Sequence, residues 1–279
     1  MKLGGNLEAV PTSIIGLIGI IGLIIIVIFW SYIFIEAIIG IFIGTCLTVF
    51  FIRLYNYLVQ QRPLNKLFGN VAKDSKCEIV LSELKVNPEV MRCSKNYPFV
   101  KGEGRKVHWH PSLGVTGEGD ARCLSHIYIL LKEAKIKDVR MVTDDKVPGD
   151  DWASNYICIG GGASNDKSKK LLDVSKPFYK FEDTGRTYGF AIESTDGQKW
   201  EPKNGEDYGM IQKLKLNNKT MFLLAGLGPL GTAGAGRYLL DKWKNIVRRA
   251  GSSEEFGVLL KFDTTRGEQL PEKVGFDKR

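Results

Sequence analysis

The chain has 279 residues, of which 44% are hydrophobic and 25% are charged, and its formal net charge at pH 7 is +8. The apolar residues are concentrated near the start, because Glu36 is the only charged side chain between Ser13 and Ile52. Residues 1–52 carry one lysine and two glutamates, so the rest of the chain carries a net charge of +9. This composition excludes a purely soluble protein, a disordered chain and a small disulfide-stabilised secreted domain.

The apolar segment is long enough for two membrane spans. Its 40 residues would form a helix of about 60 Å, twice the ~30 Å thickness of the hydrocarbon core. Trp30, Ser31 and Tyr32 interrupt the aliphatic run near its middle, and aromatic rings of this kind prefer the membrane interface. We therefore expect a transmembrane hairpin within residues 1–62, with spans at about 13–29 and 33–52. A cleaved signal peptide is the alternative, although its apolar core would be shorter, about 7–15 residues.

Basic residues flank the predicted pair of spans and are absent from the turn between them. Lys2 precedes the spans, and Arg53 and Arg62 follow them. The positive-inside rule therefore predicts a multi-pass protein of the cell inner (plasma) membrane, with both termini and the soluble domain in the cytoplasm. Gly40 and Gly44 form a G-x-x-x-G pair. This pair indicates either an oligomerisation face or simply the high glycine content of membrane helices.

Residues 63–279 are expected to form the cytosolic domain, because the residue before Pro63 is disfavoured in a helix. Five apolar runs are typical of strands buried on both faces of a parallel sheet. These runs are Glu78–Leu81, Val139–Thr143, Tyr156–Ile159, Thr220–Ala225 and Phe256–Phe262. Three runs alternate more and favour antiparallel or edge strands: Phe178–Phe181, Tyr188–Ile192 and Tyr208–Leu214.

Helical patterns lie between these strands, at Ala121–Lys135, Lys167–Leu172 and Ala233–Ala250. The last of them ends in Arg248-Arg249 before Gly251, as expected at a helix C-terminus. The order of strand, glycine loop and helix predicts an α/β fold, a Rossmann-like, mostly parallel sandwich.

Three glycine-rich segments are the most informative feature of the soluble domain. Loops that leave the carboxyl ends of neighbouring parallel strands converge on one crevice, where helix N-termini offer free N–H groups. Glycine allows a ligand to approach the backbone closely. The predicted ligand-binding residues are Gly117, Gly119, Asp120, Gly160, Gly161, Gly162, Ser164, Asn165, Gly226, Gly228, Gly231 and Thr232. The alternative is that these glycines only form tight turns.

None of these segments is a complete nucleotide-binding motif. Residues 226–231 match G-x-G-x-x-G, but a proline stands at the fourth position. No acidic residue ends a following strand about 20 residues on, where a ribose-binding carboxylate would belong. A G-x-x-x-x-G-K-[ST] loop is also absent, which argues against P-loop hydrolysis.

The chain contains no convincing catalytic set, so no catalytic residue, metal ligand or cofactor is predicted. His108 and His110 would share one side of an extended segment, as in a metal pair, or they are ordinary surface residues. Glu118 and Asp120 are candidates for acid–base chemistry, although Asp120 is the better candidate for a helix cap. The cysteines lack C-x-x-C spacing.

The positive charge has two interpretations. The lysines and arginines of the helices form solvated faces, or they attract anionic lipid head groups and an anionic nucleotide. Sequence-specific nucleic-acid binding has no support, because neither a recognition motif nor a basic arm is present.

A resemblance to a known kind of domain rests on three short segments, Ile159–Asn165, Glu206–Gly209 and Ala225–Thr232. They resemble a Rossmann-like domain of uncharacterised prokaryotic proteins, in which a strand ending in Gly-Gly-x-x-x-Asn is followed downstream by a Gly-Thr turn. Two spans before such a domain also look like the membrane effectors of antiphage nucleotide-signalling systems. This resemblance implies a homo-oligomeric, non-catalytic sensor, in which a nucleotide-type second messenger makes the helices assemble and disrupt the lipid bilayer. The alternatives are a membrane-tethered enzyme acting on a nucleotide or sugar-nucleotide, and a scaffold protein.

Overall fold

The structure is a computed structural model that describes residues 12–82, 117–147, 150–162, 164–184, 190–268 and 271–279. The chain divides into two compact units, Met1–Val59 and Gln60–Arg279. This division lies a few residues before the boundary predicted at Pro63.

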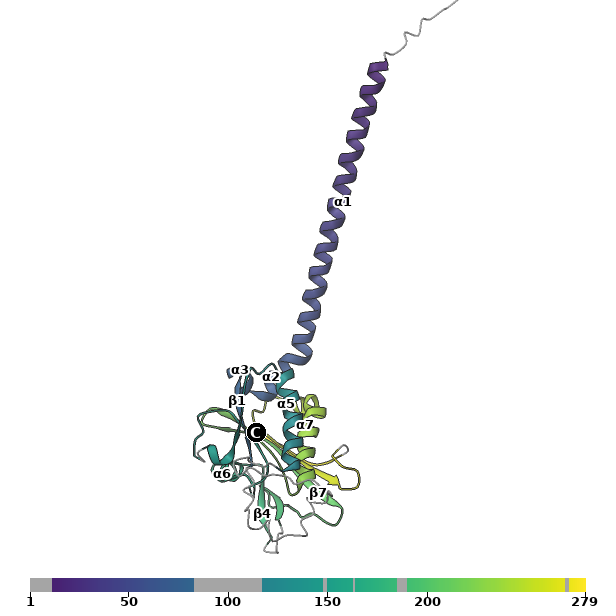
Figure 1. The fold of residues 1–279 in the computed structure, drawn as a ribbon. Helices are drawn as coiled ribbons and strands as arrows, with labels where there is room; N and C mark the ends of the chain where they lie inside the picture. Colours follow the sequence, from purple (N-terminus) through teal and green to yellow (C-terminus); the bar gives the residue numbers. More distant parts are fainter. Residues whose placement is uncertain (1–11, 83–116, 148–149, 163, 185–189, 269–270) are drawn as a thin grey trace, which may run out of the picture. The chain divides into compact units, whose positions relative to one another are not determined.

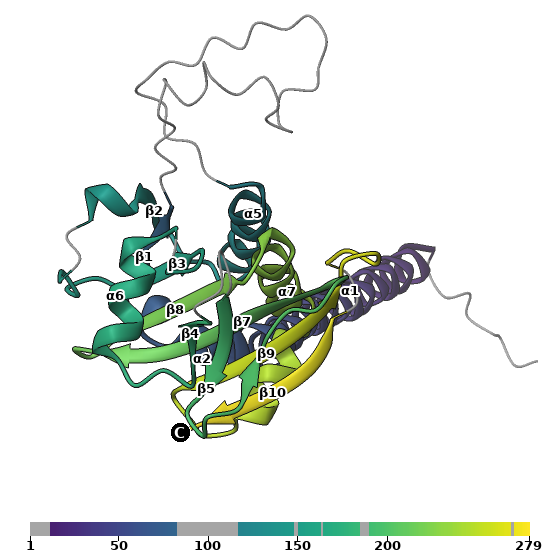
Figure 2. The same cartoon turned by 90° about the horizontal axis from the view of Figure 1, so that it is seen from below.

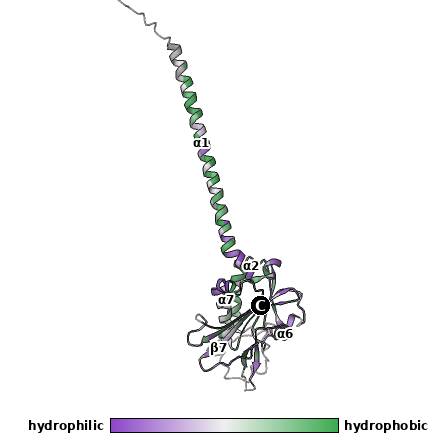
Figure 3. Ribbon diagram, turned by 180° about the vertical axis from the view of Figure 1, so that it is seen from behind, coloured by the Kyte–Doolittle hydropathy of each residue, from purple (hydrophilic) through white to green (hydrophobic). Residues whose placement is uncertain are grey.

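The described part of the first unit is one long helix, α1 (Thr12–Asn56), which is followed by a π-helical turn, η1 (Tyr57–Gln61). Figure 3 shows that α1 is hydrophobic along most of its length. Its large apolar side chains are exposed around the whole helix; Ile25, for example, is 61% exposed. A helix that is apolar on all sides requires an apolar environment. Among the described residues, this is the one helical segment long and apolar enough to cross a membrane.

The turn that was predicted at Trp30-Ser31-Tyr32 is not present, because α1 continues through these residues. Ser31 Oγ donates to the carbonyl oxygen of Val27 at 2.8 Å, which satisfies the hydroxyl within the helix. Trp, Ser and Tyr have only moderately lower helix propensities than alanine, and neither glycine nor proline interrupts this stretch. The local sequence therefore permits an unbroken helix.

The second unit contains a seven-stranded sheet in the order β10-β9-β7-β8-β3-β1-β2. The strands β2, β1, β3 and β8 are parallel neighbours, whereas β8–β7, β7–β9 and β9–β10 are antiparallel pairs. The strands are β1 (Lys76–Leu81), β2 (Asp138–Thr143), β3 (Tyr156–Ile159), β7 (Glu206–Leu216), β8 (Lys219–Gly226), β9 (Phe256–Asp263) and β10 (Glu272–Lys278). The domain is therefore an α/β fold with a mixed sheet.

A second, three-stranded antiparallel sheet follows the order β4-β5-β6. It comprises β4 (Tyr179–Asp183), β5 (Phe190–Ser194) and β6 (Lys199–Trp200). The predicted strands are all found. Strand β9 was expected to be parallel but pairs antiparallel with both neighbours. Strands β6 and β10 were not predicted.

The described helices of this unit are α2 (Arg62–Phe68), α3 (Asn70–Asp74), α5 (Glu118–Glu133), α6 (Asp166–Val174) and α7 (Pro229–Ala250), with a 3-10 turn, η3, at Asp144–Lys146. Proline lies in the first turn of α2 and of α7, where its missing N–H leaves no intrahelical bond unmade. The C-cap of α7 is Gly251, with a φ of 65°. Each predicted helix is present and begins one to four residues earlier than predicted, and α5 ends at Glu133, two residues before its predicted end.

The central strands of the main sheet are buried on both faces, because alternate side chains of each strand pack into two opposite cores. On β3, Ile157 and Ile159 belong to the core that also includes residues of α2, α5 and α7, whereas Tyr156 and Cys158 belong to the core on the opposite side. The opposite core includes Leu171 of α6 and Ile192 of β5. Figures 1 and 2 show the result, with α5 and α7 side by side on one face of the sheet. The three layers leave the carboxyl ends of β1, β3 and β8 at one edge.

Candidate functional site

A cavity of about 630 Å³ lies at the edge where the parallel strands β1, β3 and β8 end. Strand β1 is followed there by Ser82, β3 by the Gly160–Asn165 loop, and β8 by the loop that leads into α7. Helices α5, α6 and α7 begin at the same edge. The convergence of the three glycine-rich segments, which the sequence predicts, is therefore present in the fold.

Nine of the twelve predicted residues line this cavity. They are Gly117, Gly119, Asp120, Gly161, Gly162, Ser164, Gly226, Gly228 and Thr232. The other three, Gly160, Asn165 and Gly231, lie directly behind the lining and support it. Their part in binding a ligand stays a prediction.

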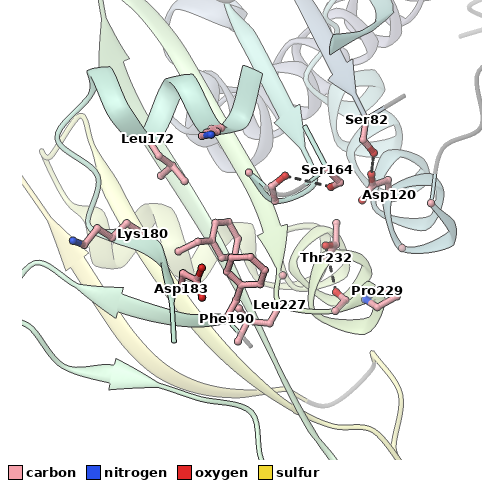
Figure 4. Close-up of a pocket in the computed structure, with 18 of the residues that line it drawn as sticks. Ser82, Asp120, Ser164, Leu172, Lys180, Asp183, Phe190, Leu227, Pro229 and Thr232 are labelled. Atoms are coloured by element: carbon pink, nitrogen blue, oxygen red, sulfur yellow. Dashed lines mark hydrogen bonds between the residues drawn. The ribbon is translucent and has the colours of Figure 1, made fainter. Parts of the chain in front are cut away.

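One wall of the cavity was not predicted from the sequence. It is formed by the three-stranded sheet β4-β5-β6. Phe181 of β4 and Phe190 of β5 bring two aromatic rings to the cavity, next to Leu172 of α6 and Leu227. Figure 4 shows Phe190 and Leu227 on this wall, with Ser82 and Asp120 at the opposite end. An apolar residue at an alternating strand position is also typical of core packing, so the sequence carries no signal for this wall.

Ser82 and Asp120 form the buried end of the cavity. The Ser82 hydroxyl donates to Oδ2 of Asp120, whose side chain belongs to the first turn of α5. Burial raises the pKa of Asp120, and the charge of Asp144 adds to this effect. Gly160, at φ 101°, approaches the same carboxylate, and a Cβ atom there would lie 2.9 Å from Oδ2. Asp120 was expected to cap the helix, but this prediction is wrong. The N-cap residue of α5 is Gly117, and no side chain makes a capping hydrogen bond there.

Asp207 of β7 occupies the N-terminus of α7. Its carboxylate accepts hydrogen bonds from the backbone N–H groups of Gly228 at 2.9 Å and Gly231 at 2.7 Å. Asp207 is 7% exposed, and its burial raises the pKa of the carboxyl despite these bonds. The sequence predicts free N–H groups at this helix start, but these two already have an internal acceptor.

Asn165 connects the carboxyl ends of two strands to α6. Its Nδ2 donates to the carbonyl oxygens of Val80 at 3.2 Å and Ile159 at 2.9 Å, and its Oδ1 accepts from the N–H of Ser168 at 3.0 Å. The side chain is buried and its hydrogen-bonding groups are used within the protein. Asn165 therefore positions the Gly160–Gly162 loop through its side chain.

Several of the predicted glycines are required by close backbone packing. A Cβ atom would lie 2.4 Å from Pro229 O at Gly119, 2.4 Å from Thr232 N at Gly226, and 2.1 Å from Tyr208 O at Gly231. These distances exclude any side chain without a backbone shift. The alternative interpretation, in which glycine serves the fold, therefore applies at these three positions, although Gly119 and Gly226 also line the cavity.

Of the remaining candidates from the sequence, Glu118 lies at this cavity, and the others lie apart from it or outside the described residues. His108, His110 and Cys93 belong to the part of the chain that is not described. His126 of α5 contacts Glu268 at 3.3 Å. Glu118 lines the cavity and pairs with Arg122 at 3.5 Å. A search of the described residues finds no cluster of three or more side chains suited to a metal ion.

The cavity has the size of a small-molecule site, for which about 300–1,000 Å³ is typical. It combines two aromatic rings, hydroxyl groups, the buried carboxylate of Asp120, three exposed carboxylates and two lysines, so it can pack against a planar ring and hydrogen-bond polar groups beside it. Comparison with protein-family models and with curated proteins finds no match for this chain.

Proposed function

We propose that this protein is a membrane-anchored sensor whose α/β domain binds a nucleotide-type small molecule in the cavity at the carboxyl edge of its sheet. The observation that carries the proposal is the convergence of three loops and three helix starts on one cavity of about 630 Å³. In open α/β sheets, ligands bind in the crevice outside the carboxyl ends of the strands. Phe181 and Phe190 supply faces for a base, and Asp120, Ser82 and Thr232 supply partners for ribose hydroxyls.

The order of the parallel strands supports a doubly wound α/β architecture for this part of the domain. The sequence of neighbours β2-β1-β3-β8 corresponds to the start of the 2-1-3-4-5 order of doubly wound folds, with its switch point between β1 and β3. The cavity lies at this switch point. The antiparallel strands β7, β9 and β10 are a departure from that pattern.

The membrane segment, in this proposal, forms the two-span hairpin expected from the sequence. Helix α1 has 45 residues, which corresponds to about 68 Å. Membrane helices tilt by up to about 40°, and even this tilt would leave more than 15 Å of apolar helix outside a ~30 Å hydrocarbon core. A turn at Trp30-Ser31-Tyr32 places both halves in the lipid. The bilayer supplies the driving force for that turn.

The sensor acts through assembly of its membrane helices. Ligand binding stabilises a homo-oligomer in which Gly40 and Gly44 form the helix contacts, and the assembled spans disrupt the plasma membrane. Both glycines lie on open helix surface, with no atom of the chain within 4 Å of a Cβ built there. Small residues at such positions permit close helix contact in lipid. A role in antiphage defence follows from the resemblance to membrane effectors of nucleotide-signalling systems.

A second candidate function is a membrane-tethered enzyme for nucleotides or sugar-nucleotides. The buried carboxyl of Asp120 favours it, because a raised pKa in a cavity is common among acid–base catalysts. The two functions differ in whether product forms.

The test uses the full-length protein in detergent with a panel of ribonucleosides and their mono-, di- and cyclic phosphates. If the protein is a sensor, at least one compound raises its melting temperature, and chromatography shows that this compound is not converted. An enzyme converts the compound. A scaffold protein shows neither effect, and the proposal then fails.

A further inference from the structure

The two ends of the cavity differ in burial and charge, and this difference bears on how a ligand is oriented in it. Building on the proposed function, we infer that the buried end of the cavity, lined by Ser82, Asp120 and Thr232, binds the uncharged ribose of a nucleoside-type ligand and excludes phosphate. The outer end, lined by Lys180, Asp183 and Phe190, then receives the remainder of the ligand. Figure 4 shows these two sets at opposite sides of the cavity.

Phosphate sites in α/β folds depend on free N–H groups and on the positive end of a helix dipole. Helix α7 is the longest helix that begins at the cavity, yet Asp207 already accepts from Gly228 and Gly231. An internal carboxylate thus occupies the place of a ligand anion. A phosphate there would have to displace a side chain that is more than nine-tenths buried.

The other two helix starts are also next to acidic side chains. At α6, the N–H of Asp166 donates to Oδ2 of Asp144 at 2.8 Å. At α5, Glu118 and Asp120 themselves stand in the first turn. Each of the three helices therefore presents a carboxylate where an incoming anion would bind, and like charges repel at short range.

Among the residues that the structure describes, the lining has more negative than positive groups. It includes four carboxylates, Glu118, Asp120, Asp173 and Asp183, and two amines, Lys169 and Lys180. Lys180 is already bound to Glu193 at 3.0 Å. Both amines lie away from the described residues of the buried end, where the charged side chain is the carboxylate of Asp120.

The same end is suited to hydroxyl groups. Asp120 is 7% exposed, and its Oδ2 accepts from the Ser82 hydroxyl. A carboxylate has two oxygen atoms and about four acceptor positions, which leaves capacity for the two adjacent hydroxyls of a ribose. The backbone glycines Gly119 and Gly161 keep the surrounding wall free of side chains.

The test is calorimetric titration of the full-length protein in detergent with the four ribonucleosides, their 2′,3′-dideoxy forms and their 5′-mono- and diphosphates. For the ribonucleoside that binds best, we expect removal of both hydroxyls to weaken binding about tenfold or more, as for hydrogen bonds to a charged group. Addition of one or two phosphates is expected to change affinity less than about threefold.

Two matched variants connect this result to the carboxylate. Asp120→Asn should weaken ribonucleoside binding about tenfold and leave dideoxynucleoside binding unchanged. Glu133→Gln removes a charge from the exposed end of the same helix and should alter neither. A diphosphate that binds more than about tenfold better than its nucleoside, or a dideoxynucleoside that binds equally well, overturns the inference while the sensor function survives. If no compound in the panel binds, the proposed function fails and this inference fails with it.

Discussion

Asp207 accepts a hydrogen bond from the backbone N–H of Gly231 at 2.7 Å, and this bond joins the start of β7 to the first turn of α7. The absence of a side chain at Gly231 makes the approach possible, because a Cβ atom would lie 3.1 Å from the same carboxylate and 2.1 Å from Tyr208 O. The N–H groups of Gly228 and Gly231, at the start of α7, therefore already have a hydrogen-bond acceptor within the protein, beside the cavity.

The first prediction concerns Asp207. Replacement by alanine leaves the N–H groups of Gly228 and Gly231 without their acceptor, and we expect a loss of roughly 2–4 kcal/mol in the free energy of unfolding. Asp207→Asn retains one acceptor oxygen and should lose less. Unfolding by denaturant, followed by circular dichroism, measures both. Equal stability of Asp207→Ala and the wild type would contradict the role given to this residue.

The second prediction compares two glycines of the same site. Gly231→Ala places a methyl group against Tyr208 O, so it should destabilise the domain by more than about 3 kcal/mol. At Gly117 the nearest atom to a built Cβ is 4.0 Å away, and its φ of −63° suits alanine. Gly117→Ala should therefore change stability by no more than about 1 kcal/mol. Thermal unfolding of the two variants gives the comparison directly.

The third prediction uses the raised pKa of Asp120. Its folded pKa lies above the ordinary value of 3.8 for an aspartate, so the folded state binds more protons than the unfolded state between those two pKa values. The stability contribution of this group therefore falls as pH rises through that window.

Asp120→Asn stays neutral and retains an acceptor for Ser82. We expect the variant to be more stable than the wild type by about 1 kcal/mol at pH 7–8, and the difference to disappear as pH falls to 3.8. Unfolding measured across this range tests the sign. A variant that is less stable at neutral pH would show that the ionised carboxylate stabilises the fold.

The fourth prediction distinguishes a hairpin from a continuous helix. Epitope tags are placed before Met1 and after Arg279, and external protease is added to spheroplasts. A hairpin keeps both tags on the cytoplasmic side, so both stay protected until the membrane is opened. A single span would expose one tag and protect the other, which would reject the hairpin.

The fifth prediction addresses assembly in the membrane. Gly40→Leu with Gly44→Leu obstructs close helix contact, while the open surface around both positions accommodates the larger side chains within one chain. We expect ligand-dependent dye release from liposomes to be lost, with ligand affinity unchanged. Gly16→Leu with Gly19→Leu is the matched control, because these glycines are equally open but belong to another part of α1. Undiminished leakage in the Gly40 and Gly44 variant would leave the membrane segment as an anchor.

The sequence by itself determined the elements of the soluble domain and the set of loops that surround the cavity. Continuous apolar runs such as Tyr156–Ile159 and glycines after them are local signals, and they were sufficient to predict strands, helices and their meeting at one edge. The direction of β9 was predicted wrongly, since a strand buried on both faces shows the same apolar run in parallel and antiparallel pairs. Strand β10 was missed because its residues are exposed or only partly buried, so they do not form a continuous apolar run.

Only the tertiary structure decided which hydrogen-bond partners the polar groups of the glycine-rich loops have. Asp207 precedes Gly231 by 24 residues in a strand whose alternation gives no sign of a helix cap, and only the packing of α7 on β7 brings the two together. In the same way, the aromatic wall comes from Phe181 and Phe190 of a separate sheet. The sequence shows which polar groups are present, but their hydrogen-bond partners depend on contacts between distant segments. These contacts decide whether the N–H groups at a helix start are free to bind a phosphate or already have an acceptor within the protein.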